Sequence, residues 1–290
     1  MTEWPPITNV GLITYKGFNL IRNVHEEVHL HKLEKFEIRE SDIFIITYPK
    51  SGTTWMQYIL DLMYHSDQLN GEHSKRTMEV VPWIEVRMKR IDYSKMPSPR
   101  TFASHLPPSL VPQQLRDQGK VIYIARNPKD VAVSFYHFHN FSKLLEDKPD
   151  FDTFLDEYLE GKVFGNSWFD HIQGWYSNKD NFNLLFLTYE EMRKDLRGTL
   201  VKVSNFLDKN IDDAMLDMIV EKSSFESMRL CPNANLEHQT PKYFDHSKGA
   251  MLRKGKVGDW KTIFTVAQNE KFDKIYNEKM KVLLGFGWDL

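Results

Sequence analysis

Short apolar runs in the chain alternate with stretches that have the periodicity of a helix. Ile43 to Thr47 reads IFIIT, a run typical of a strand buried on both faces. The residues from about Thr53 to Tyr64 then place apolar side chains at the spacing of an amphipathic helix. The pattern therefore predicts a strand, a turn and a helix, in this order.

The same alternation recurs along the rest of the chain. Thr101 to Ser104 predicts a short strand, and Val121 to Ala125 and Asn183 to Thr188 predict two buried ones. Helices are expected from about Lys129 to Phe141 and from Tyr189 onward. Strands that alternate with helices predict an α/β fold, with a central, mainly parallel sheet flanked by helices on both faces.

Length and composition fit one domain of this kind. The chain has 290 residues, of which 41% are hydrophobic and 27% charged, close to ordinary globular usage. The polar, turn-rich stretches 71–77 and 235–249 predict loops, and neither is composed like an interdomain linker. We expect a single domain over residues 1–290.

Charge and cysteine content restrict the function and the location. The formal net charge of -2 gives no reason for bulk attraction to nucleic acid or to an anionic membrane. Cys231 is the only cysteine, so no internal disulfide can form, which fits a reducing compartment. The N-terminus lacks an apolar signal-peptide core, and no apolar run approaches the roughly 18 residues of a membrane span. The expectation is a cytoplasmic protein.

Chemically capable residues follow each of the predicted strands. The loop that begins at Thr47, and the side chains of His105, Arg126 and Tyr189, all come directly after a strand. Ligands of open α/β sheets bind at the carboxyl ends of the strands. We therefore expect these positions to meet at one edge of the sheet.

The loop TYPKSGTTW, Thr47 to Trp55, has the composition of an anion-binding turn. Backbone N–H groups at a helix N-terminus bind anions, and Lys50 adds a positive charge. A nucleotide P-loop, however, places its lysine directly after its last glycine, whereas here the lysine precedes the only glycine, Gly52. An ordinary turn with Thr53 as the helix cap explains the same residues.

Three further segments have both a functional and a structural interpretation. Arg126 and Ser134 either bind a second phosphate or are a surface arginine and a buried serine. The basic loop from Arg253 to Gly258 either clamps a phosphate or is a solvated loop. His105 is either a general base or a structural histidine.

The segment from His25 to His29 matches the zinc motif H-E-x-x-H. It runs into the charged stretch from Lys32 to Asp42 and lacks the Gly-x-x-His continuation of the longer zinc motif. We therefore predict no metal site.

Taken together, these motifs resemble the cytosolic sulfotransferases over nearly the whole chain. The order and spacing of the family signatures fit TYPKSGTTW at Thr47 to Trp55, SHLP at Ser104 to Pro107, ARNPKDVAVSFYHF at Ala125 to Phe138 and RKGKVGDWK at Arg253 to Lys261. Within the family, FASHLP and the block VFGNSWFDHIQGWY, Val163 to Tyr176, are most similar to the amine sulfotransferase subgroup.

The resemblance implies the donor 3′-phosphoadenosine 5′-phosphosulfate (PAPS), used without a metal. It implies one group of residues for the phosphosulfate, one for the 3′-phosphate and one around the adenine, with Met228 as a further contact. The residues for the phosphosulfate are Lys50, Ser51, Gly52, Thr53, Thr54 and Trp55. Those for the 3′-phosphate are Arg126, Ser134, Arg253, Lys254 and Gly255. Those around the adenine are Trp55, Tyr189, Ser223 and Phe225.

The implied reaction is in-line sulfuryl transfer to an amine, phenol or alcohol group of a small lipophilic acceptor. His105 would remove the proton of the acceptor, and Lys50 would stabilise charge on the leaving phosphate. Ser134 can hydrogen-bond Lys50 and restrain it until the acceptor arrives. Many family members have a lysine two residues before the histidine, where this chain has Ala103, so the rate and the acceptor choice stay open.

The resemblance also implies an acceptor pocket and a homodimer. The pocket would be lined by Trp83, Phe138, Leu236, Tyr243 and Phe244. Glu85 is either a partner of a cationic amine or a structural residue. The family's short dimer motif is matched by Lys261, Thr265, Val266 and Glu270.

Two other functions are weighed against this one. A P-loop kinase needs ATP, magnesium and a carboxylate after a core strand, but Arg126 follows VIYIA and only Glu190 lies after the third strand. A nucleotide-binding module that has lost catalysis is conceivable because of Ala103.

Overall fold

A four-stranded parallel sheet lies at the centre of the computed structural model, which describes residues 7, 9–65, 77–88, 91–235 and 242–280. The strand order is β4-β3-β5-β6, with β3 (Ile43–Thr47), β4 (Thr101–Ser104), β5 (Lys120–Ala125) and β6 (Leu184–Thr188). All four predicted strands are confirmed. β5 begins one residue earlier than its apolar run, and β6 begins one residue later.

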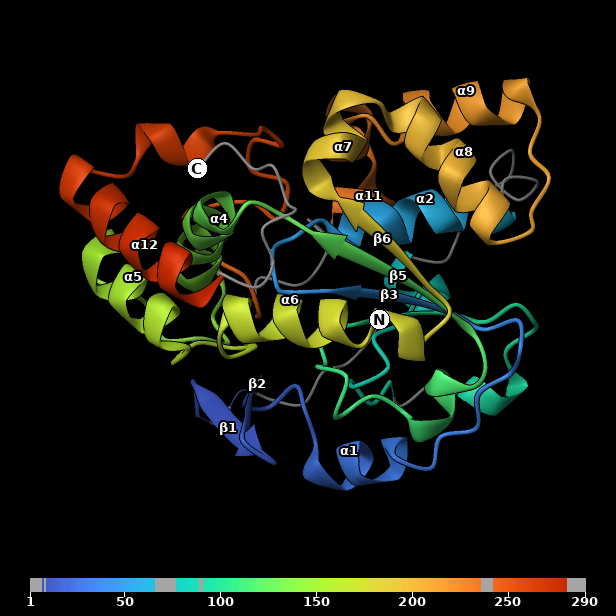
Figure 1. The fold of residues 1–290 in the computed structure, drawn as a ribbon, viewed down its shortest axis with the longest axis horizontal. Helices are drawn as coiled ribbons and strands as arrows, with labels where there is room; N and C mark the ends of the chain where they lie inside the picture. Colours follow the sequence, from blue (N-terminus) through green and yellow to red (C-terminus); the bar gives the residue numbers. More distant parts are fainter. Residues whose placement is uncertain (1–6, 8, 66–76, 89–90, 236–241, 281–290) are drawn as a thin grey trace.

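Alternation along the strands separates two hydrophobic cores, one on each face of the sheet. In β3, Phe44 and Ile46 pack into one core, whereas Ile43 and Ile45 pack into the other. Helices α4, α5, α6 and α12 cover the first face, and α2, α7, α8 and α9 cover the second (Figure 1). The sheet is therefore buried on both sides, which explains why its strands read as unbroken apolar runs.

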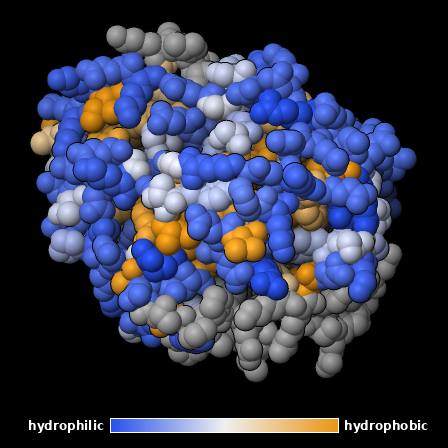
Figure 2. Space-filling model, turned by 90° about the horizontal axis from the view of Figure 1, so that it is seen from below, coloured by the Kyte–Doolittle hydropathy of each residue, from blue (hydrophilic) through white to orange (hydrophobic). Residues whose placement is uncertain are grey.

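The helices are α1 (Glu27–Leu33), α2 (Thr53–His65), α3 (Thr77–Val80), α4 (Pro128–Phe141), α5 (Phe151–Glu160), α6 (Trp168–Ser177), α7 (Tyr189–Lys194), α8 (Leu196–Phe206), α9 (Asp213–Lys222), α10 (Phe225–Leu230), α11 (Pro232–Asn235) and α12 (Val266–Lys279). Short 3-10 turns are η2 (Tyr93–Lys95), η3 (Gln113–Arg116), η4 (Lys179–Asn181) and η5 (Asp259–Thr262). Among the described helices, none has the length and apolar character needed to cross a bilayer. The surface seen in Figure 2 is largely hydrophilic, with its apolar residues in small separate patches.

A β-hairpin that the sequence patterns did not single out precedes the sheet. Its strands, β1 (Leu12–Tyr15) and β2 (Phe18–Ile21), pair antiparallel. Lys16 and Gly17 between them have φ of 48° and 80°, the left-handed backbone that a two-residue hairpin turn requires. The hairpin contributes to the first core and leads through residues 22–26 into α1.

The parallel register brings the ends of the strands to one edge. Ile46 pairs with Ser104, Thr47 with Ile124, and Ala125 with Thr188. The residues that follow these positions therefore emerge side by side, as the sequence predicts.

Candidate active site

The turn between β3 and α2 has an unusual backbone that exposes main-chain donors. Lys50 and Gly52 have φ of 70° and 107°, both in the left-handed region. A Cβ atom at Gly52 would lie 3.0 Å from the Tyr189 ring, so the turn requires glycine there. Thr53 is the first residue of α2. Because the first N–H groups of a helix have no partner within it, this turn can bind an anion.

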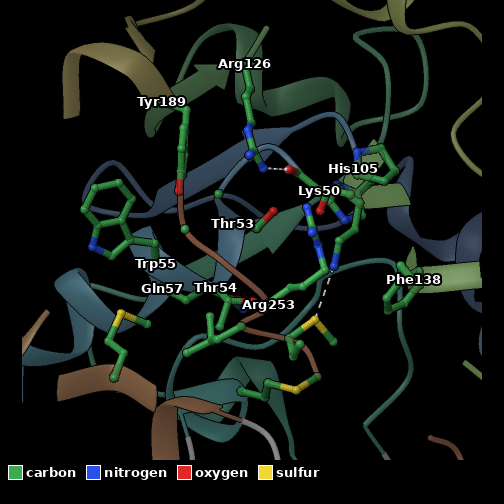
Figure 3. A pocket seen from close by; sticks show the side chains of 18 of the residues that line it. Lys50, Thr53, Thr54, Trp55, Gln57, His105, Arg126, Phe138, Tyr189 and Arg253 are labelled. Atoms are coloured by element: carbon green, nitrogen blue, oxygen red, sulfur yellow. Dashed lines mark hydrogen bonds between the residues drawn. The ribbon is translucent and has the colours of Figure 1, made fainter. Parts of the chain in front are cut away.

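Arginines surround this turn with hydrogen-bond donors. Arg126 follows β5, donates to the Lys50 carbonyl at 2.9 Å, and lies 4.3 Å from the centre of the Tyr189 ring (Figure 3). Among the described residues, Arg126 Nε, Arg253 Nε and Ser51 Oγ are buried without a hydrogen-bond partner. Buried donors of this kind are costly unless a ligand satisfies them, so the turn fits a polyanion.

The basic loop near residue 255 is organised by an acidic side chain. Asp259 accepts from Arg253 Nη2 at 2.6 Å and from Lys254 Nζ at 2.7 Å. Gly255 has φ of 61°, and a Cβ atom there would lie 2.3 Å from the Phe225 ring. The loop is therefore held against the cavity wall in a fixed conformation.

Lys50 is the cation whose side chain is most strongly perturbed. Its Nζ donates to the Met251 sulfur at 3.4 Å and lies 4.3 Å from the centre of the Phe138 ring. Burial, together with the charges of Arg126 and Arg253, lowers the pKa of Lys50 to about 7. Without an anion beside it, this lysine is only partly protonated at neutral pH.

Ser134 lines the same cavity from α4. Its side chain is half-buried. The structure gives Lys50 the Met251 sulfur as its partner rather than the Ser134 hydroxyl. The described contacts include no hydrogen bond between Lys50 and Ser134, so the restraint of Lys50 by Ser134 stays a prediction.

His105 lies directly after β4 and is held as a neutral imidazole. Its Nδ1 lies 2.7 Å from the Thr47 carbonyl oxygen. Because a carbonyl only accepts, Nδ1 carries the proton and Nε2 carries the lone pair. Burial lowers the pKa of His105 to about 3. The Trp83 ring lies 4.5 Å from the imidazole. The side chain has the tautomer and charge state of a general base.

Glu85 is placed beside His105 by an extra bridge at the sheet edge. Trp83 pairs in parallel with Ala103, so Glu85 comes opposite His105 two residues further on. Glu85 Oε1 accepts from the His105 backbone N–H at 2.8 Å. Burial raises the pKa of Glu85 to about 7, and its Oε2 has no partner among the described residues. Glu85 Oε1 thus holds the backbone of His105, whereas Glu85 Oε2 has no hydrogen bond to a described residue.

Aromatic side chains form the far end of the cavity. Trp55 donates from Nε1 to the Ser223 carbonyl at 2.8 Å, and its ring lies 5.4 Å from the Tyr189 ring. The Ser223 hydroxyl donates to a backbone carbonyl one helical turn earlier at 2.6 Å, so it is free only to accept. Phe225 and Met228 complete this wall.

The opposite half of the cavity is apolar. Trp83, Phe138 and Phe244 are among its lining residues, and their contact with an acceptor stays a prediction. Tyr243 is buried but is not among the lining residues, and Leu236 lies outside the described residues. The sequence patterns did not single out the remaining wall, which includes Ile21, Val24, His25, Val86, Phe164 and Met251.

The alternative motifs do not form the sites that they suggest. His25 precedes α1, and His29 Nε2 bonds the Ile84 carbonyl at 2.8 Å, so the two histidines do not share a helix face. The described ranges contain no group of three His, Cys, Asp or Glu residues placed to hold a metal. Glu190, the acid that a kinase would require, accepts from the Asn127 backbone at 3.0 Å.

Comparison with known proteins agrees with this geometry. Residues 40–283 match the family described as "Sulfotransferase domain". The chain is 46% identical over 283 residues to the amine sulfotransferase of Oryctolagus cuniculus, covering 96% of this chain and 94% of that protein. It is 38% identical to sulfotransferase 1A1 of Canis lupus familiaris, covering 97% of each.

A solved structure shows the same fold. The crystal structure of mouse sulfotransferase SULT7A1 complexed with PAP superposes with a TM-score of 0.79 at 33% identity, covering 94% of this chain and 95% of that one. Three donors near Lys50, namely Arg126 Nε, Arg253 Nε and Ser51 Oγ, have no partner in the described part of the chain and fit the phosphates of such a nucleotide. The chain belongs to the cytosolic sulfotransferase family and is a PAPS-dependent enzyme that acts on small acceptors.

Proposed function

We propose that the enzyme transfers the sulfuryl group of PAPS to an amine, phenol or alcohol group of a small lipophilic acceptor, with amines as the preferred class. The observation that carries the proposal is the neutral His105 at the junction of the cationic turn and the apolar half of the cavity. The relative named amine sulfotransferase supports the preference for amines.

Each side chain of the junction has one role in this proposal. PAPS supplies the sulfuryl group, and the Lys50 turn, Arg126 and the Arg253 loop would hold its phosphates. His105 Nε2 accepts the proton that the acceptor loses, while the Thr47 carbonyl fixes the ring. Lys50 stabilises the negative charge that grows on the leaving phosphate. An amine acceptor reacts as the neutral base, because an ammonium has no lone pair with which to attack.

Ala103 leaves Lys50 as the principal cation at the transferring group. It is fully buried in β4, and its backbone pairs with the segment that contains Trp83. We infer that the position serves the sheet edge and that charge stabilisation rests on Lys50 and on the N–H groups of α2.

The experiment is transfer from ³⁵S-labelled PAPS to a panel of arylamines, phenols and alcohols. His105→Ala should abolish transfer, while the affinity for adenosine 3′,5′-bisphosphate (PAP), measured by calorimetry, should change less than about threefold, because His105 does not contact the nucleotide. No transfer by the wild type to any acceptor, despite tight PAP binding, would instead indicate a binding module. Joint loss of transfer and PAP binding would mean that His105 is structural.

The location, the domain extent and the assembly complete the proposal. Family membership supports a cytoplasmic enzyme formed by one domain over residues 1–290. For a homodimer, the support is the first turn of α12. Thr265 caps this helix, and the next residue, Val266, is 75% exposed, so its apolar side chain is available for contact with a second subunit. Lys261 and Glu270, the other residues of the motif, are exposed as well.

A further inference from the structure

A second buried histidine lines the acceptor half of the cavity, and the transfer step does not use it. His25 lies between β2 and α1 and is 6% exposed. It belongs to the H-E-x-x-H sequence, yet it is outside the helix, and His29 is committed to the Ile84 carbonyl. The motif therefore leaves His25 available for another role.

The protonation of His25 mirrors that of His105. Its Nδ1 lies 3.0 Å from the Ile21 carbonyl oxygen, so Nδ1 carries the proton. Burial lowers the pKa of His25 to about 4, which keeps the ring neutral at physiological pH. The described residues provide no hydrogen-bond partner for Nε2, whose lone pair is thus an open acceptor in a cavity wall.

The two imidazoles flank one aromatic side chain. The Phe164 ring lies 5.6 Å from the His25 ring and 5.6 Å from the His105 ring, so the two imidazoles are at most about 11 Å apart. This separation is within the length of a bicyclic aromatic molecule. A small acceptor with its reacting group at His105 can therefore extend along Phe164 to His25.

The surroundings of His25 indicate what kind of group its Nε2 atom would bind. The neighbouring wall residues Ile21, Val24 and Val86 are apolar. Nε2 is not among the fully buried atoms without a partner, so it is accessible from the cavity. A bound substrate that covers this atom loses free energy unless it supplies a hydrogen-bond donor in place of water. The described residues supply no hydrogen-bond partner for Nε2. An N–H or O–H group of the bound substrate would therefore be its partner.

We propose that His25 is a specificity-determining residue, whose Nε2 accepts a hydrogen bond from a second N–H or O–H group of the acceptor. This inference rests on the proposed function. It narrows the substrate class to small aromatic acceptors that carry a reacting amine or hydroxyl at one end and a hydrogen-bond donor at the other.

The test uses two acceptors of nearly equal shape that share one reacting amine. 6-Amino-N-methyl-2-naphthamide carries an amide N–H at its far end, whereas methyl 6-amino-2-naphthoate has an oxygen in its place. For the wild type we expect kcat/KM to be about three- to tenfold higher with the amide, because one neutral hydrogen bond is worth roughly this factor. The difference should lie mainly in KM.

Variants of the cavity wall show which residue causes the preference for the amide. His25→Leu should remove the preference for the amide while leaving the ester within about twofold, and His25→Gln, which keeps an acceptor oxygen, should restore part of it. Val24→Ala, the matched control, should affect both acceptors alike. Unchanged PAP affinity shows that each variant is folded.

Three results would overturn the inference. One is equal kcat/KM for amide and ester in the wild type. Another is an equal loss with both acceptors in His25→Leu, which would assign His25 to packing. The third is failure of both naphthalenes in an enzyme that transfers to smaller arylamines, since the cavity would then have no room for the second donor. By contrast, the absence of transfer to every acceptor would refute the proposed function itself.

Discussion

Replacement of Lys50 by methionine tests whether bound nucleotide changes the charge of this lysine. Burial, together with Arg126 and Arg253, lowers its pKa to about 7 in the enzyme without ligand. At about pH 8, roughly a tenth of the Lys50 side chains are then protonated. A phosphate beside Nζ raises the pKa, because an opposite charge favours the ammonium form. PAP binding at about pH 8 should therefore take up about 0.9 proton at Lys50.

Calorimetry in buffers of different ionisation enthalpy measures this uptake. The slope of the observed enthalpy against the ionisation enthalpy of the buffer gives the number of protons bound. The phosphates of the ligand have second pKa values of about 6, so they contribute little at about pH 8. The wild type should give a slope near 0.9 there and Lys50→Met a slope near zero. At about pH 6 the Lys50 contribution should fall to about 0.1, because the free side chain is already charged.

A control identifies the group that takes up the proton. Lys256 is exposed and lies on the same cavity wall, so Lys256→Met should keep the uptake of the wild type. If Lys50→Met and the wild type give the same slope at about pH 8, the proton does not go to Lys50. Burial would then not keep Lys50 partly neutral until a phosphate binds beside it.

Three shorter predictions concern the nucleotide wall, acid stability and assembly. Gly255→Ala places a Cβ atom 2.3 Å from the Phe225 ring, so PAP should bind at least about tenfold more weakly in calorimetry; unchanged affinity would remove Phe225 from the nucleotide site. Burial lowers the pKa of His139 from 6.5 to about 4, so its neutral form favours folding above pH 6.5 and this contribution is lost as the pH falls towards 4. His139→Phe should therefore reduce the acid loss of unfolding free energy by about 3 kcal/mol in urea titrations, and parallel pH profiles would contradict this. Val266→Glu, at a side chain that is 75% exposed, should shift sedimentation from dimer to monomer with little change in stability; a monomeric wild type would refute the dimer.

The sequence predicts the sheet and the cationic turn because both depend on local patterns. The apolar run of β3 is set by burial on both faces, and the order of strand, turn and helix places the Lys50 turn at the sheet edge. The left-handed backbone at Gly52 follows from its approach to Tyr189, which no local pattern shows. The sequence therefore predicts that the turn exists, but it does not predict the backbone conformation of the turn.

The acceptor half was largely beyond prediction because it is assembled from distant segments. Ile21 comes from a hairpin whose strands are too short to give a clear periodicity. His25 comes from the segment between this hairpin and α1, and Phe164 comes from the loop before α6. The position of Glu85 depends on the bridge between Trp83 and Ala103, which is a tertiary pairing. The predicted donor site consists of short segments that each have their own sequence signature, whereas the acceptor half of the cavity has no such signature.

The geometry also explains why the lysine precedes the glycine. The left-handed φ of Lys50 turns its carbonyl towards Arg126, which donates to it, and leaves the side chain to extend along Phe138 into the cavity. Arg126 therefore fixes the backbone of Lys50 and also lowers its pKa. A lysine directly after Gly52 would take the place of Thr53, the first residue of α2, whose buried hydroxyl lies 2.6 Å from the Thr47 hydroxyl. The order of the residues thus couples the two cations, so that at about neutral pH an anion between them completes the protonation of the lysine.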